Sequence, residues 1–149
     1  MSHFPQGEDL ALQLLKGHLL VEEVMRELFM LQLPNPQALS GNKGTSLNCH
    51  QVICLVEAIT PKSNNISWVW VASKKLNNIR NDLAHKLKPN GLNEKVLDLV
   101  KFVKSKSPEI DKLANTAGFT QQSDLFIVVM VICSCLSSLK AVLNNSNAP

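Results

Sequence analysis

The sequence predicts an all-α fold, an up-and-down bundle of four to five main helices. Apolar residues recur every three or four positions along most of the chain, which is the period of an amphipathic helix. No segment shows the strict apolar–polar alternation of a half-buried strand. Proline, glycine and asparagine gather between the periodic segments and are typical of helix ends and turns. With 149 residues and a hydrophobic fraction of 45%, the chain is long enough for a single domain, 1–149, with its own core.

The helical segments follow one another with short connections. In the first, the apolar stripe is formed by Leu10, Leu14, Val21, Met25 and Leu28, and prolines end the helix at residues 34–36. The predicted main helices span residues 8–33, 45–59, 67–87, 93–106 and 121–143, with a short helical stretch over 108–114. Residues 1–7 and 144–149 are expected to be frayed tails.

The composition limits which binding partners and which cellular compartment we expect for the protein. The net charge of +3 permits a nucleic-acid partner but does not demand one. The four cysteines lack zinc-finger spacing, so we expect reduced thiols, no metal and no cofactor.

The N-terminus has neither the basic head nor the apolar core of a signal peptide, which favours a cytoplasmic protein. The apolar run over 125–136 is shorter than the roughly 20 residues of a membrane span, so a buried helix and no membrane partner are expected.

The central predicted helix, residues 67–87, has two faces of opposite character. At about 100° per residue, Asn77, Arg80, Asn81 and His85 fall within an arc of about 140°. The opposite side carries an apolar stripe formed by Trp68, Ala72, Leu76, Ile79, Leu83 and Leu87. We therefore expect one face to pack in the core and the other to present Arg, Asn and His side chains together.

The first helix carries a smaller polar pair. His18 and Glu22 are four residues apart and therefore share a helix face. They are either a local polar pair at the edge of the apolar stripe, or Glu22 reaches a neighbouring helix and orients a catalytic group.

Arginine and histidine on one face suit the cleavage of an RNA phosphodiester without a metal. Glycine-rich phosphate loops, zinc-protease motifs and serine elbows are missing from the sequence, which disfavours metal-assisted hydrolysis and acyl transfer. His85 could take the proton of a ribose 2′-hydroxyl or protonate the leaving oxygen, and Arg80 could hold the phosphate. The reaction needs an acid and a base, and a symmetric homodimer would supply a second His85. A purely structural role for these side chains remains the alternative.

The stretch 80–85, RNDLAH, resembles the R-x4-6-H signature of the HEPN superfamily, including the polar residue after the arginine. The preceding residues of the run 76–81, LNNIRN, extend the similarity, and the run 16–22, KGHLLVE, is similar to first helices of such domains. The resemblance implies a HEPN-like helical domain that forms a dimer with one composite cleft. Many members of the superfamily are metal-independent endoribonucleases that act as toxins or in phage defence.

On this resemblance each polar residue has an implied role. Arg80 would position and stabilise the phosphate, His85 would be the acid or base, and Asn81 would orient them. Glu22 would support these catalytic residues from the first helix, and Asn77 is a weaker candidate for the same site. RNA is the implied substrate, and an antitoxin or regulatory protein is an implied partner.

Two features separate the chain from some relatives. Toxins paired with a nucleotidyltransferase antitoxin often carry a tyrosine two residues after the histidine, where this chain has Leu87 and no tyrosine anywhere. Regulation by nucleotidylation of that residue therefore does not apply. Other members, such as the mannitol operon repressor-like proteins, are non-enzymatic regulators. The alternative function is thus a non-catalytic regulatory or protein-interaction module of the same fold.

Overall fold

Within the residues that the structure describes, the chain forms five α-helices that pack against one another. The computed structural model describes residues 7–39, 46–62, 65–85, 91–107, 110 and 124–146. The helices are α1 (Gly7–Leu31), α2 (Cys49–Ile59), α3 (Ser67–His85), α4 (Leu92–Lys106) and α6 (Asp124–Ser146), and a short 3-10 helix, η1, spans Pro36–Leu39. No strand occurs within the described residues, so the prediction of an all-α fold is confirmed.

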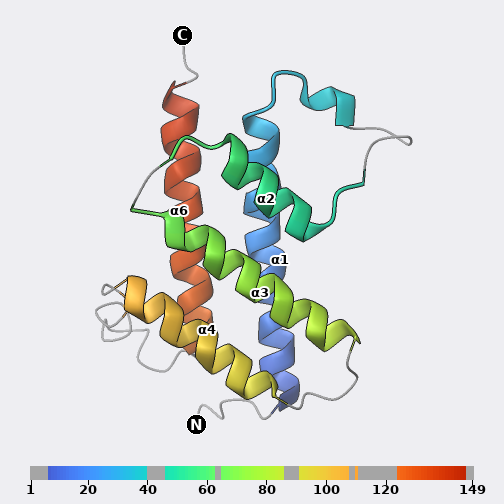
Figure 1. Cartoon of the computed structure of the whole chain (residues 1–149), viewed down its shortest axis with the longest axis vertical. Helices are drawn as coiled ribbons and strands as arrows, with labels where there is room; N and C mark the ends of the chain where they lie inside the picture. Colours follow the sequence, from blue (N-terminus) through green and yellow to red (C-terminus); the bar gives the residue numbers. More distant parts are fainter. Residues whose placement is uncertain are drawn as a thin grey trace.

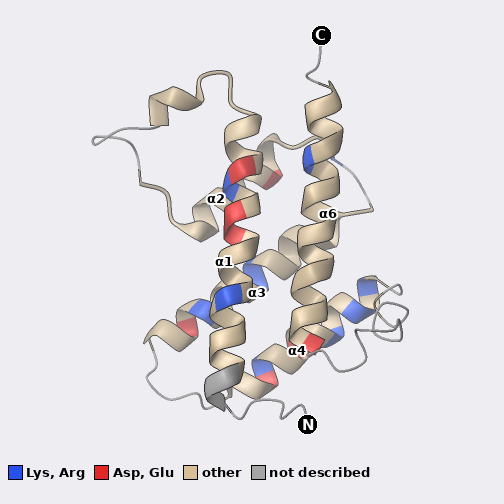
Figure 2. Ribbon diagram, turned by 180° about the vertical axis from the view of Figure 1, so that it is seen from behind, with Lys and Arg blue, Asp and Glu red and all other residues tan. Residues whose placement is uncertain are grey.

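The helices form two layers (Figure 1). In one layer α1 and α6 lie side by side and run in the same direction. In the other layer α2, α3 and α4 lie across them, alternate in direction and place α3 in the middle. Seen from behind, α1 and α6 cover the three crossing helices (Figure 2). The N-terminal part of α3 therefore lies near α6, and α1 contacts all three crossing helices.

The core lies between the two layers and is built from aliphatic side chains. Its largest fully buried members include Leu14, Met25, Leu28, Ile53, Leu76, Leu99, Ile132 and Leu136. Burying one such side chain contributes about 1.5–3 kcal/mol. The apolar stripe predicted for the central helix is inside: Ala72, Leu76 and Ile79 are buried, and Trp68 and Leu83 pack against the core, while Leu87 lies outside the described residues.

Most predicted helix bounds agree with the structure to within about three residues, and α2 is the clearest exception. This helix was expected from residue 45 but begins at Cys49. Asn48 caps it: the Asn48 side chain accepts a hydrogen bond from the Gln51 backbone N–H at 2.9 Å, and the Gln51 side chain accepts one from the Asn48 N–H at 3.0 Å. This capping box satisfies two N–H groups that a helix end would otherwise leave unpaired.

Both helices at the chain ends extend into the tails that were expected to fray. Helix α1 begins at Gly7 and helix α6 continues to Ser146, so residues 7 and 144–146 are helical. Residues 1–6 and 147–149 lie outside the described residues, as does the predicted stretch 108–114 except for Ile110, which is buried.

Helix α6 is longer than the apolar run that predicted it. It has 23 residues, and among the described residues it is the one helix long and apolar enough to cross a membrane by length and composition. Core helices of soluble bundles share this length and composition. In the structure one side of α6 packs against α1, α3 and α4, and 39% of its most apolar window is buried.

Candidate active site

A polar pocket of about 380 Å³ lies where α1, the start of α2 and the C-terminal half of α3 meet. It is lined by His18, Glu22 and Arg26 of α1, by Asn48, Cys49 and His50 at the start of α2, and by Asn77, Arg80, Asn81 and His85 of α3. Every one of these residues carries a side chain with a polar or ionisable group. The pocket thus joins segments that are far apart in the sequence.

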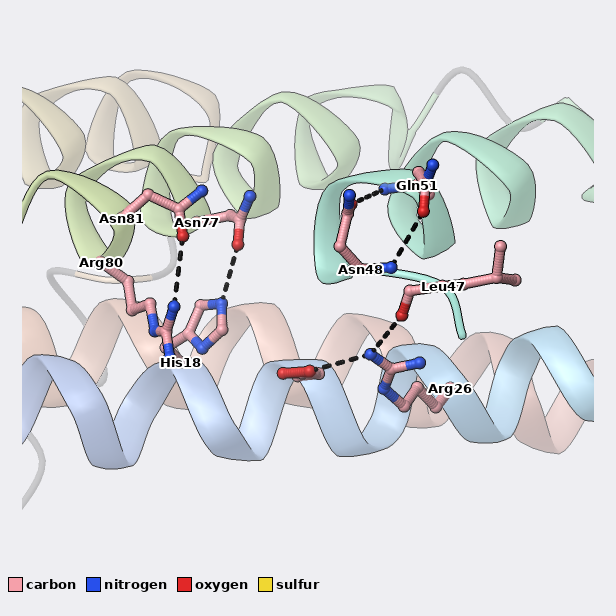
Figure 3. Close-up of polar contacts among 9 residues, drawn as sticks. His18, Arg26, Leu47, Asn48, Gln51, Asn77, Arg80 and Asn81 are labelled. Atoms are coloured by element: carbon pink, nitrogen blue, oxygen red, sulfur yellow. Dashed lines mark hydrogen bonds and ion pairs between the residues drawn. The ribbon is translucent and has the colours of Figure 1, made fainter. Parts of the chain in front are cut away.

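Helix α3 contributes the face that the sequence predicts. Arg80, Asn81 and His85 all line the pocket, so the structure brings the three predicted catalytic side chains to one site. Arg80 Nη1 donates a hydrogen bond to Asn81 Oδ1 at 3.3 Å (Figure 3). This bond uses one of the five N–H groups of the guanidinium. His85 is the last residue of α3 and is exposed to solvent.

Asn77, predicted on the same open face, is instead buried, with 2% of its surface exposed. His18 Nε2 donates a hydrogen bond to Asn77 Oδ1 at 3.0 Å, across the interface between α1 and α3 (Figure 3). Because a carbonyl oxygen only accepts, Nε2 is the nitrogen that carries a proton in this bond. The Asn77 amide therefore sets the tautomer and orientation of the His18 ring at the back of the pocket.

Glu22 was expected to support a catalytic group from the first helix. In the structure Glu22 Oε1 accepts a hydrogen bond from Arg26 Nη2 at 3.1 Å on its own helix. The same Arg26 nitrogen donates to the Leu47 carbonyl oxygen at 2.9 Å (Figure 3). The pair holds the segment before α2 against α1. The hydrogen bond that crosses from α1 to α3 is made by His18, and Glu22 reaches the site only as part of the pocket lining.

Arg26, Asn48, Cys49 and His50 were missed by reasoning from the sequence. They come from α1 and α2, whereas the predicted motif is local to α3. One signal was present: the N-x-x-Q spacing at residues 48–51 is a capping box, and it places Cys49 and His50 in the first turn of a helix. The sequence carries no sign that this turn faces α3.

His50 adds a further imidazole, and so a further proton-transfer group, to the pocket. The sequence offers one histidine in the RNDLAH stretch, but the folded chain lines one pocket with three imidazoles, those of His18, His50 and His85. His50 Nε2 lies 3.5 Å from Cys54 Sγ on the outer side of α2. A single chain therefore supplies more than one proton-transfer group to the same pocket.

Cys49 is unsuited to act as a nucleophile. Burial, and secondly the Glu22 carboxylate, raise the pKa of its thiol from 9.0 to about 11, although Arg26 and Arg80 oppose the rise. A helix N-terminus usually lowers the pKa of a cysteine, but here the loss of solvent dominates. Since the thiolate is the reactive form, covalent catalysis by Cys49 at neutral pH is disfavoured.

The charges around the pocket favour an anion. Two arginines, Arg26 and Arg80, line it together with three imidazoles, and Glu22 is the one carboxylate among the lining residues that the structure describes. The Glu22 charge is paired with Arg26. Among the residues that the structure describes, no carboxylate forms an ion pair with Arg80, so its charge can meet a phosphate or carboxylate group.

Comparison with known proteins adds no relative, because no family model, curated protein or solved structure matches this chain.

Proposed function

We propose that the protein is a metal-independent endoribonuclease of the HEPN type and that the pocket between α1, α2 and α3 is its RNA site. One observation carries the proposal: Arg80 and His85 line the same polar pocket, together with two further imidazoles. This combination supplies a phosphate-binding cation and proton-transfer groups within one cavity.

The chemistry follows from the residue types. Arg80 binds the scissile phosphate and stabilises the negative charge that grows on its oxygens in the transition state. An imidazole removes the proton of the ribose 2′-hydroxyl, whose oxygen attacks phosphorus, and a second imidazole protonates the departing 5′-oxygen. The products are a 2′,3′-cyclic phosphate and a 5′-hydroxyl. His85, exposed at the pocket edge, serves as one of the two imidazoles.

The buried His18 ring is held by Asn77, so the second imidazole has two candidate sources. His50 lines the same pocket from α2, so one chain suffices. In a homodimer the other copy of His85 supplies it across a two-fold axis. A row of exposed leucines on α1 (Leu12, Leu15 and Leu19) supports a dimer. At about 100° per residue, Leu15 and Leu19 lie within about 60° of Glu22 around the helix, so an interface there would border the pocket.

The biological role that goes with this chemistry is a toxin, phage-defence or stress effector in the cytoplasm, held in check by an antitoxin or regulatory protein. The chain has no tyrosine, so nucleotidylation of a tyrosine is not its control.

The test is RNA cleavage by purified protein in the presence of a chelator. Wild type is expected to cut a panel of RNAs and leave 2′,3′-cyclic phosphate ends. Arg80→Ala and His85→Ala are each expected to lower the rate about 100-fold or more. Lys101→Ala removes an exposed cation on α4, outside the pocket, and should leave the rate unchanged.

His50→Ala separates the two sources of the second imidazole. A loss as large as that of His85→Ala assigns the acid–base pair to one chain, and an unchanged rate assigns it to two copies of His85. Intact RNA after incubation with wild type, or pocket variants as active as wild type, would refute the ribonuclease.

The exposed apolar face also favours a second candidate, a non-catalytic interaction module. Besides the α1 leucines, α6 exposes Phe126 and Met130 one turn apart. This second function would be assigned if the wild-type protein left the RNA panel intact and bound a partner protein that the Leu15→Glu variant no longer bound.

A further inference from the structure

Three metal-binding side chains of different kinds converge at the pocket. A ring nitrogen of His18, a carboxylate oxygen of Glu22 and Sγ of Cys49 all lie within 4.8 Å of one another. His18 and Glu22 are one turn apart on α1, and Cys49 is the first residue of α2. Spacing along the chain does not reveal this set, and the sequence alone predicts no metal, because the third donor comes from a separate helix.

We propose that His18, Glu22 and Cys49 form a Zn²⁺ site with its fourth position open to water or an anion in the pocket. The proposal goes beyond the ribonuclease activity, whose chemistry uses no metal, and stands independently of it.

The distances suit zinc after small side-chain movements. Tetrahedral zinc with bonds of about 2.0–2.3 Å keeps its donor atoms about 3.3–3.6 Å apart. The three donors here are at most 4.8 Å apart, so side-chain rotations that shorten a separation by up to roughly 1.5 Å would complete the geometry.

Each donor keeps an atom for the ion. The Asn77 oxygen accepts from His18 Nε2, so in the neutral ring Nδ1 is the nitrogen left to bind an ion. Zinc-ligating histidines usually donate their other N–H to a neighbouring acceptor in this way, which orients the ring. Arg26 occupies Oε1 of Glu22, so the second carboxylate oxygen can bind the metal while the ion pair stays in place.

Donor type and charge both select zinc. A sulfur and an imidazole nitrogen favour Zn²⁺ over Mg²⁺ or Ca²⁺, which prefer oxygen ligands. A metal-bound cysteine is a thiolate, so Cys49 and Glu22 together supply two negative charges to a doubly charged ion. The ion and its two anionic ligands would therefore form a neutral unit beside Arg26 and Arg80.

The test measures metal binding by the full-length protein without RNA. Protein treated with a chelator and dialysed is titrated with ZnCl₂ by calorimetry, and with CoCl₂ while the absorption spectrum is recorded. We expect one Zn²⁺ per chain and a sulfur-to-cobalt charge-transfer band in the near ultraviolet, which reports a thiolate ligand.

Three variants decide the ligands. Cys49→Ser should abolish the band and weaken Zn²⁺ binding roughly 100-fold or more, since changes even behind metal ligands cost roughly 10–100-fold. Glu22→Gln should weaken binding and keep the band. The matched control is Cys54→Ser, which removes the neighbouring half-buried thiol on α2. It should change neither the absorption band nor the affinity for Zn²⁺. Circular dichroism checks that each variant is folded.

The proposal is overturned if wild type binds no Zn²⁺, if Cys49→Ser binds it as tightly as wild type, or if Cys54→Ser loses the band. The last result would move the site to the His50–Cys54 pair. Because no RNA is present, none of these outcomes bears on the ribonuclease, and a failed cleavage assay leaves the zinc site standing.

Discussion

At the scale of single residues, Asn77 shows how burial changes the meaning of a polar side chain. The helix period correctly assigns it to the same side of α3 as Arg80 and His85. Burial, however, makes it a structural partner of His18 as well as a lining residue. A buried polar group that loses its partner costs its full desolvation penalty.

Asn77→Ala is therefore expected to lower the free energy of unfolding by about 1–3 kcal/mol, because it leaves the His18 N–H buried without its acceptor. Urea denaturation measures the change. Asn78→Ala, the exposed neighbour on α3, is the control and should stay within about 0.5 kcal/mol of wild type. Equal effects of the two substitutions would contradict the importance of the hydrogen bond.

At the scale of helices, the close approach of α1 and α6 depends on Gly17. A Cβ at this position would lie 2.7 Å from Cγ2 of Val129 on α6. Valine is stiff at χ1, so its methyl group cannot turn away easily. The sequence does not reveal this contact, because a glycine inside a helical pattern by itself indicates only a locally less stable helix.

We expect Gly17→Ala to destabilise the protein by about 1–2 kcal/mol, since overpacking exceeds the gain of about 1 kcal/mol in helix propensity. Urea unfolding of wild type, Gly17→Ala, Val129→Ala and the double variant tests whether contact with Val129 causes the loss of stability. In the Val129→Ala background the cost of Gly17→Ala should shrink or change sign. Stabilisation by Gly17→Ala alone would show that the helices separate without cost.

At the scale of the whole molecule, the exposed leucines of α1 predict a homodimer. Leu19 exposes 63% of its surface next to Leu12 and Leu15, an arrangement that a second copy would cover. Light scattering on a size-exclusion column should give twice the chain mass for wild type and one chain mass for Leu19→Glu.

Leu97→Glu is the matched control for this experiment, because Leu97 is 50% exposed but lies on α4, and it should remain dimeric. A monomeric wild type would contradict the dimer. It would also leave His50 as the second imidazole of the ribonuclease.

The sequence by itself determined the helical class, the approximate position of most described helices and the face of α3 that carries Arg80, Asn81 and His85. These are local properties, since the side chains of one helix are arranged by its own 3.6-residue period. A cap can likewise be read within a few residues, as Asn48 and Gln51 show.

Only the tertiary structure decided what that face meets. His18 lies 59 residues from Asn77 in the chain, and Cys49 reaches the pocket from a third helix. Which faces come together depends on how the described helices share one core, and no local pattern records that packing. For this reason the arginine–histidine motif and the His18–Glu22 pair were visible in the sequence, while their convergence with Cys49 and His50 on one pocket appeared only in the fold.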